Sequence, residues 1–140
     1  MLRVFGGCHC GNLRIDVRLT GAPESYNPRE CDCGFCRKHG AAYVSDPEGK
    51  LSIAVTDPAA LTRYRQGNAL AEMLICRQCG VLAGALFATD GQLFGAVNVQ
   101  ALEGAHTFGA RLVVSPRKLN ATEKTRRWQD IWFPNVSVRS

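Results

Sequence analysis

CHCG at residues 8–11 and CRQCG at residues 76–80 are the two stretches of sequence that decide the fold. A third cysteine motif, CDCGFC at residues 31–36, lies between them. The two outer motifs hold four cysteines, which is the complete tetrahedral ligand set of a structural Zn²⁺. The middle motif holds three, which leaves one position open for water or substrate, as at a catalytic Zn²⁺. The seven cysteines are Cys8, Cys10, Cys31, Cys33, Cys36, Cys76 and Cys79.

Disulfide bonding is the first competing explanation for this many cysteines. Seven is an odd number, so at least one thiol would stay unpaired, and cysteines this close in sequence rarely reach disulfide geometry. Residues 1–7 lack the features of a signal peptide, so we expect the reducing cytoplasm, where clustered cysteines favour metal. A redox dithiol at Cys33/Cys36 or Cys76/Cys79 is the minor alternative, and no βαβ pattern accompanies either pair.

Length and charge narrow the class of protein. A chain of 140 residues with 46% hydrophobic composition is expected to form a single domain, 1–140, and no apolar stretch is long enough to span a membrane. The formal charge of +5 counts every cysteine as neutral. Seven thiolates carry −7 and two Zn²⁺ carry +4, which lowers the net charge to about +2. This value argues against nucleic acid as a partner.

The hydrophobic pattern predicts a mainly β fold. Leu13, Ile15, Val17 and Leu19 alternate with polar residues, and residues 51–55 repeat this period of two, which is typical of half-buried strands. Further strands are expected at residues 41–45, 62–65, 69–75, 81–87, 93–99 and 112–115, with turns at 46–49, 67–68 and 90–91. We therefore expect several short strands in two small antiparallel sheets.

The outer motif CRQCG at residues 76–80 is expected to join two of these strands as a zinc knuckle. One strand runs into Cys76, the next leaves Cys79, and Gly80 permits the positive φ that lets backbone N–H groups approach the sulfurs. Cys10 also borders a predicted strand. A metal shared by the two outer motifs would therefore join the edges of two sheets.

A helix is expected near the C-terminus. Trp128, Ile131 and Trp132 share helical spacing, and Thr122 is the expected N-cap. At this spacing, packing of Trp128, Trp132 and Phe133 in the core is favoured over closure of a ligand pocket. The sequence thus assigns these aromatic residues to the core.

Three other segments carry weaker patterns. Asp57-Pro58 predicts a cap for one helical turn over residues 59–61. Arg126 and Arg127 are expected on a solvated face rather than in a nucleic-acid site. Residues 134–140 are expected to form a loose tail.

The order and spacing of the motifs resemble a known family. GGCHCG at residues 6–11, CDCGFCRK at 31–38, AAY at 41–43 and CRQCG at 76–80 follow one another as in the glutathione-dependent formaldehyde-activating enzymes, whose family includes centromere protein V. The resemblance extends over roughly residues 6–100, and Asp32 stands where the family usually has histidine. It implies a zinc-stapled β-tent fold of the Mss-four-like type.

The resemblance also implies the metal sites and the activity. One structural Zn²⁺ would bind Cys8, Cys10, Cys76 and Cys79, and a second, open one would bind Cys31, Cys33 and Cys36. The implied activity is the reversible formation of S-hydroxymethylglutathione from formaldehyde and glutathione, a carbon–sulfur lyase reaction in the cleaving direction. The alternative is a non-catalytic zinc module that binds a protein or nucleic acid. An open metal in a pocket favours the enzyme, and a buried four-coordinate metal favours the module.

Charged residues beside the middle motif leave alternatives open. Arg37 and Lys38 either stabilise the thiolates as solvated charges or attract an anionic substrate to the open site. His39 is expected at the surface, with a proton shuttle and a fourth metal ligand as the alternatives. These three residues are the candidates for substrate contact and proton transfer.

The remaining polar candidates carry simpler expectations. Asp32 is expected to be exposed, with a hydrogen-bond acceptor behind the metal ligands as the alternative. His9 is expected to face solvent, and His106 is expected in an ordinary loop. None of the three is therefore assigned to the reaction itself.

Overall fold

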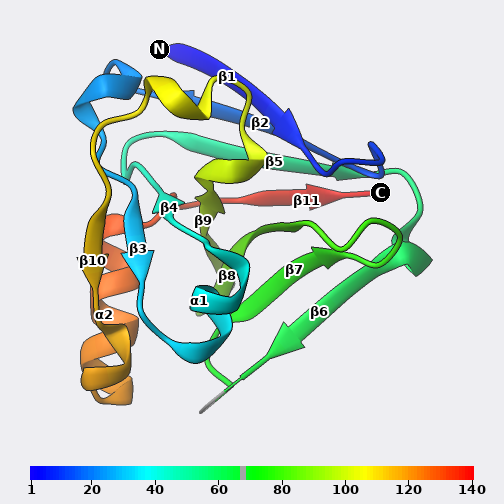
Figure 1. Cartoon of the computed structure of the whole chain (residues 1–140). Coiled ribbons are helices and arrows are strands. Elements are labelled where there is room, and N and C mark those ends of the chain that lie inside the picture. The colour runs from blue at the N-terminus through cyan, green and yellow to red at the C-terminus, as the bar shows by residue number, and fades with distance from the viewer. Residues whose placement is uncertain (67–68) are drawn as a thin grey trace.

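Two β-sheets form the framework of the computed structural model, which describes residues 1–66 and 69–140 (Figure 1). The expected turn at residues 67–68 lies outside the described residues. Within this described part, one sheet contains four strands in the order β1 (Leu2–Gly7), β2 (Leu13–Leu19), β5 (Lys50–Val55) and β11 (Ser137–Arg139). The other contains seven, in the order β10 (Leu112–Val114), β3 (Arg29–Cys31), β4 (Tyr43–Val44), β9 (Gln92–Asn98), β8 (Leu82–Thr89), β7 (Glu72–Cys76) and β6 (Leu61–Arg65).

Short helices connect these strands. The α-helices are α1 (Gly34–His39) and α2 (Ala121–Ile131). Single 3₁₀ turns form η1 (Pro23–Ser25), η2 (Pro58–Ala60), η3 (Val99–Ala101), η4 (Ala105–Thr107) and η5 (Pro116–Lys118). The cap predicted at Asp57 is confirmed, because its side chain accepts a hydrogen bond from Ala59 N at the start of η2. None of the described helices combines the length and apolar composition that crossing a bilayer requires.

The alternating pattern of the sequence sets the four-stranded sheet. In the register of β2 and β5, Ile15 lies opposite Ile53 and Val17 lies opposite Leu51, so the apolar residues of both strands point to the same face. That face is buried, whereas the intervening arginines and lysine face solvent. The mainly β prediction is confirmed, and burial of this apolar face holds the sheet against the rest of the protein.

The sheets are mixed rather than antiparallel as expected. β10 runs parallel to β3, and β11 runs parallel to β5. Residues 134–140 were expected to be loose, but they supply β11 and the buried Val136, whose backbone N–H donates to Leu93 O. A C-terminal segment that returns over this distance can pair in either direction, because no tight turn restricts it.

The C-terminal helix begins earlier than its expected cap. Asn120, not Thr122, caps α2: its side chain accepts from Glu123 N, and the Glu123 side chain accepts from Asn120 N. This reciprocal pair satisfies two backbone donors of the first turn at once, which a threonine two residues later would not do. The helix therefore starts where both groups of the capping box are available.

Phe133 connects the C-terminal segment to the core. Its side chain is fully buried in the cluster that contains the inward residues of both sheets, and its backbone exchanges two hydrogen bonds with Gly95 in β9. A Cβ atom added at Gly95 would lie within 3.1 Å of side-chain atoms of Leu86 and Val136. The small residue therefore allows the C-terminal segment to lie close against β9.

Replacement Phe133→Ala should lower the free energy of unfolding by about 3–5 kcal/mol, because it leaves a cavity between the sheets. Urea denaturation measures this change. Leu112→Ala is the matched control: its side chain is 54% exposed, so the effect should stay within about 0.5 kcal/mol. A loss below about 1 kcal/mol for Phe133→Ala would contradict the assigned packing.

Candidate functional site

The two outer cysteine motifs meet in space. The sulfurs of Cys8, Cys10, Cys76 and Cys79 all lie within 4.8 Å of one another. Cys10 Sγ is 3.5 Å from Cys76 Sγ and 3.7 Å from Cys8 Sγ. Four thiolates at these distances repel unless a cation lies among them, so the donor set suits a soft divalent metal with tetrahedral geometry.

Both outer motifs form the same kind of tight turn. Gly11 and Gly80 follow the last cysteine of each motif and adopt positive φ values of 86° and 79°. Their N–H groups donate to the carbonyl oxygens of Cys8 and Cys76, and Leu13 N donates to Cys8 Sγ. Glycine adopts this backbone conformation without the strain that a side chain would add. The knuckle expected at residues 76–80 therefore occurs at both outer motifs.

The middle motif forms a second cluster of three sulfurs. Cys31 ends β3, Cys33 is the N-cap of α1, and Cys36 lies in its first turn, with ligand atoms within 4.8 Å of one another. Cys36 N donates to Cys33 Sγ over 3.3 Å. A hydrogen bond from Cys36 is the main cause that lowers the pKa of Cys31 to about 6, so Cys31 is a thiolate at neutral pH. This cluster too is a ready metal ligand set.

Two residues that the sequence analysis did not single out contact these sulfurs. Tyr43 Oη lies 3.2 Å from Cys36 Sγ, and Gln66 Nε2 donates to Cys33 Sγ over 3.4 Å. Burial, followed by the charge of Cys36, raises the pKa of Tyr43, so its phenol keeps its proton and donates to the sulfur. The AAY motif at residues 41–43 was the available signal for Tyr43, whereas Gln66 carried none.

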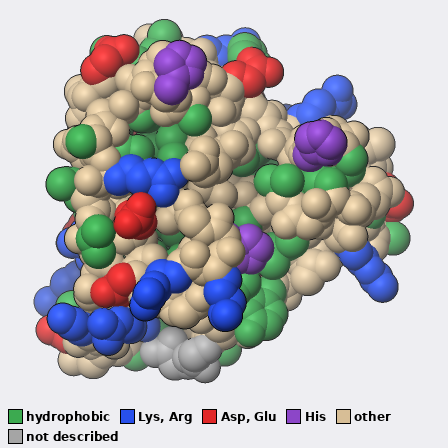
Figure 2. All heavy atoms as spheres, in the orientation of Figure 1, with side chains coloured by type: hydrophobic (Ala, Val, Ile, Leu, Met, Phe, Trp, Pro, Cys, Tyr) green, Lys and Arg blue, Asp and Glu red, His purple; other side chains and the backbone are tan. Residues whose placement is uncertain are grey.

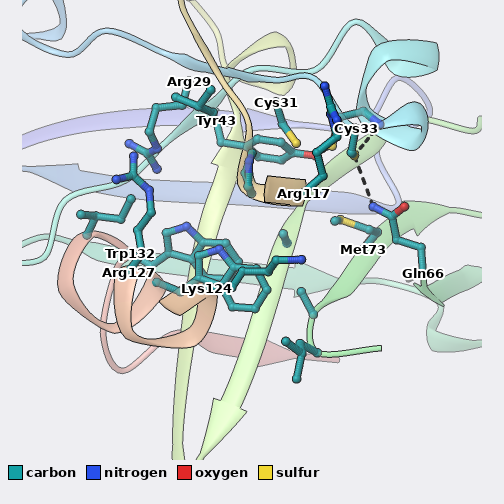
Figure 3. A pocket seen from close by; sticks show the side chains of 18 residues that line it. Arg29, Cys31, Cys33, Tyr43, Gln66, Met73, Arg117, Lys124, Arg127 and Trp132 are labelled. Atoms are coloured by element: carbon teal, nitrogen blue, oxygen red, sulfur yellow. Dashed lines mark hydrogen bonds between the residues drawn. The ribbon is translucent and has the colours of Figure 1, made fainter. Parts of the chain in front are cut away.

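The three sulfurs open into a cavity of about 200 Å³ (Figure 3). The lining residues come mainly from strands β3, β4, β7, β8 and β10 of the seven-stranded sheet and from the helical elements α1, η5 and α2. Apolar lining includes Met73, Ala85 and Ile131, and Tyr43 lies beside the sulfurs. The central cluster is therefore accessible to a small molecule, as an open three-ligand site requires.

Four cations line the same cavity: Arg29, Arg117, Lys124 and Arg127. Figure 3 shows Arg29 and Arg127 together on the side opposite Cys33. Burial, followed by the charge of Arg127, lowers the pKa of Arg29 to about 10, so it remains charged at neutral pH. None of the described lining residues is acidic. The cavity is thus suited to an anion.

Asp32 orients one of these cations and is not the exposed residue that was expected. Its carboxylate accepts from Ser115 Oγ over 2.6 Å and from Arg117 Nε over 3.2 Å, and its side chain is 22% exposed. The hydrogen bond from Ser115 and the charge of Arg117 hold the pKa of Asp32 below its ordinary value. The residue that departs from the family pattern therefore fixes Arg117 at the cavity.

Arg37, Lys38 and His39 lie elsewhere. All three are exposed on α1, and none is among the residues that line the cavity. The His39 ring packs on Phe35 with centroids 4.6 Å apart, and His39 does not belong to the three-sulfur group. His9 and His106 are also exposed, as expected. The substrate-binding role of Arg37 and Lys38 stays a prediction.

The aromatic residues near the C-terminus pack in the core as expected, and two of them also border the cavity. Trp132 is buried in a core cluster with Trp128 packed against it, and both line the cavity with stacked rings whose centroids are 4.7 Å apart. Phe133 lies in the core, as expected. Arg127 lines the cavity, whereas its neighbour Arg126 faces solvent. Figure 2 shows Lys and Arg side chains gathered on this side of the molecule, over α2 and β10.

Comparisons with known proteins agree with the cysteine pattern. The family model described as glutathione-dependent formaldehyde-activating enzyme matches residues 3–116. Among solved structures, a structural-genomics protein from Rhodobacter sphaeroides is 31% identical, with 71% of this chain and 88% of that chain covered and a TM-score of 0.53. The family match includes all seven cysteines and ends before α2, so Lys124 and Arg127 lie outside it.

The two clusters should differ in their effect on stability. Cys76→Ser should remove one metal per chain and strongly lower Tm, because the outer cluster joins segments far apart in sequence. Cys33→Ser should also remove one metal, with a much smaller change in Tm, because its cluster joins neighbouring residues. Elemental analysis and thermal melting measure both effects. Equal losses of Tm would contradict this division.

Cys31 should be unusually reactive once metal is removed. In the chelated protein, its rate of alkylation by iodoacetamide should rise with pH around a midpoint of about 6, because only the thiolate reacts. Peptide mapping by mass spectrometry follows the modified residue. Cys36→Ala removes the main hydrogen bond to Cys31 and should move the midpoint upward. A midpoint near 9.0 in the unaltered chain would show that the thiolate is not stabilised.

Proposed function

Because this chain belongs to the family of glutathione-dependent formaldehyde-activating enzymes, we propose that it makes and cleaves adducts of a small thiol and a small aldehyde. In the cleaving direction this is a carbon–sulfur lyase reaction. Glutathione and formaldehyde are the substrates that the family suggests. The observation that carries the proposal is the opening of three cysteine sulfurs into a cavity lined by cations.

The metal in this proposal is Zn²⁺, two per chain. Cys8, Cys10, Cys76 and Cys79 would hold a structural ion, and Cys31, Cys33 and Cys36 would hold the second beside the cavity. The second ion would supply Lewis acidity to the thiol sulfur or to the aldehyde oxygen. All seven cysteines are free of disulfides, which fits this role and a cytoplasmic location.

The chain's own residues bind and orient the thiol. Arg29, Arg117, Lys124 and Arg127 offer charge-assisted hydrogen bonds to carboxylates such as those of glutathione. Arg29 and Arg127, which lie opposite Cys33, would hold an acidic group of the substrate away from the sulfurs and leave its thiol free to approach them (Figure 3). Arg117 is held in place by Asp32, so less side-chain entropy is lost on binding.

The remaining contacts keep the reacting end in place. Tyr43 donates to Cys36 and fixes the orientation of that sulfur, and Gln66 does the same for Cys33. Trp128 and Met73 exclude water from part of the cavity. Addition forms a carbon–sulfur bond, converts the aldehyde C=O to C–OH and moves the thiol proton to that oxygen; cleavage reverses these changes.

The non-catalytic zinc module is less well supported as the role of the central cluster. A module that uses metal only for folding needs a closed shell, and the described residues supply three sulfurs and no fourth protein ligand at this cluster. The adjoining cavity has no function in that alternative. Access to the sulfurs therefore favours the enzyme.

Exchange NMR of formaldehyde with glutathione tests the proposal directly. The zinc-loaded chain should accelerate formation and cleavage of the hydroxymethyl adduct above the uncatalysed rate, and Cys33→Ser should abolish the acceleration. An acceleration that survives loss of the central metal would contradict the assigned centre. Loss of acceleration with both metals retained would indicate a role for Cys33 other than metal binding.

Replacing one cavity cation should weaken binding of the thiol. Arg127→Gln should raise KM for glutathione at least about tenfold with a smaller effect on kcat, because one charge-assisted hydrogen bond is lost. Arg126→Gln is the matched control, since it removes the same charge from the exposed face of the same helix. Equal effects of the two variants would show that the cavity does not bind the anion.

A further inference from the structure

A second concentration of positive charge lies on the solvent face of the four-stranded sheet, and the central cysteine site does not use it. A shallow depression of about 510 Å³ occupies this face. Five cations line it, Arg3, Arg14, Arg18, Lys50 and Arg139, together with one acid, Asp16. No residue of this depression lines the cysteine cavity, so the two surfaces are separate.

Strand register places the cations in rows. Arg3 lies opposite Arg18, and Arg18 lies opposite Lys50, which forms one row across β1, β2 and β5. Four residues along β2, Arg14 lies opposite Ala54, and Ala54 lies opposite Arg139 in β11. Since alternate residues of a strand share a face, both rows point to the same side. The two rows are about 13 Å apart along the strands.

Most of this charge is uncompensated within the chain. Arg3 pairs with Asp16 over 2.6 Å. The other four cations are exposed and form no ion pair with the described residues. Like charges opposite each other, such as Arg3 and Arg18, destabilise a sheet. An anionic partner with repeated charges would remove this repulsion in both rows.

An aromatic residue adds a stacking platform between the rows. Phe5 lies opposite Asp16, is 48% exposed, and carries the Arg3 guanidinium over its ring at 4.9 Å from the centroid. The hydroxyl-bearing Ser52 also borders the depression. A flat guanidinium held over a ring offers a cationic plane on which an unpaired base can stack.

We propose that this sheet face binds single-stranded nucleic acid, with phosphates on the two rows of cations and a base on the Arg3–Phe5 platform. The net charge of about +2 does not oppose this, because binding depends on where charge is concentrated rather than on its sum. Duplex is a poorer fit, because the described residues that line the depression all belong to strands of one sheet, whereas a groove is read by a helix or ribbon that enters it. An anionic membrane is also a poorer fit, because Phe5 is covered by Arg3.

Fluorescence anisotropy of a labelled uridine oligonucleotide with the zinc-loaded chain tests the proposal. Affinity should fall as salt rises, with a slope of about −3 in a plot of log K against log salt, as expected for four neutralised phosphates. The double variant Arg18→Glu/Lys50→Glu should bind at least about tenfold more weakly, and Phe5→Ala about fivefold. Adduct exchange and metal content should stay unchanged in both, which shows that they fold.

A matched variant controls for charge alone. Lys118→Glu/Arg126→Glu makes the same charge change on exposed residues outside the sheet face and should retain most of the affinity. Three results would overturn the proposal: no binding at low salt, equal weakening by the two double variants, or tighter association with phosphatidylserine vesicles than with the oligonucleotide. The adduct assay is separate, so failure here leaves the proposed catalytic function intact.

Discussion

The contact of Cys10 with Cys76 joins the two sheets of the structure. Their sulfurs lie 3.5 Å apart although 66 positions separate them in sequence. One comes from the loop between β1 and β2 of the four-stranded sheet, and the other ends β7 of the seven-stranded sheet. A metal bound by four thiolates here closes a loop that contains the central cysteine motif. Its binding energy therefore contributes directly to the stability of the folded chain.

This junction also sets the position of the central cysteine cluster. Between the two outer motifs, β3 and β4 place Cys31 and Tyr43 at one side of the seven-stranded sheet, and α1 places Cys33 and Cys36 beside them. The α2 helix then covers the opening with tryptophans and cations. The thiolates lie on one wall of a small cavity, and Arg29 and Arg127 lie on the opposite wall (Figure 3). A thiol that carries carboxylates matches both walls, since its two kinds of group need opposite partners.

Sequence alone predicted the parts of the fold that local patterns determine. The alternation over residues 13–19 defines β2 to its last residue, and the spacing of the outer cysteines defines both the knuckle and the four-sulfur group. Strands β1 and β3 were missed because one is an exposed edge and the other has three half-buried residues, so neither shows a clear period. The parallel pairing of β11 depends on the path of the whole chain, which no local pattern encodes.

The cavity shows the same division between local and distant information. Its cysteines could be predicted because the three of them are close together in sequence. Its cations come from β3, η5 and α2 and meet only after folding. Proximity in sequence pointed to Arg37 and Lys38, which are exposed and do not line the cavity, and their role in substrate binding stays a prediction. The rows of charge on the four-stranded sheet could not be predicted from the sequence for a related reason. The arginines occupy the polar positions of separate strands, and only the strand register aligns them into rows.

Cadmium NMR of the cadmium-substituted chain tests the central claim most directly, namely that seven thiolates divide into a closed four-sulfur site and an open three-sulfur site. We expect two cadmium resonances, of which one shifts on addition of glutathione while the other does not move. A single resonance, or two resonances whose chemical shifts both stay unchanged with glutathione, would contradict the division into a closed and an open site. It would also contradict the assignment of Cys31, Cys33 and Cys36 as the reactive centre.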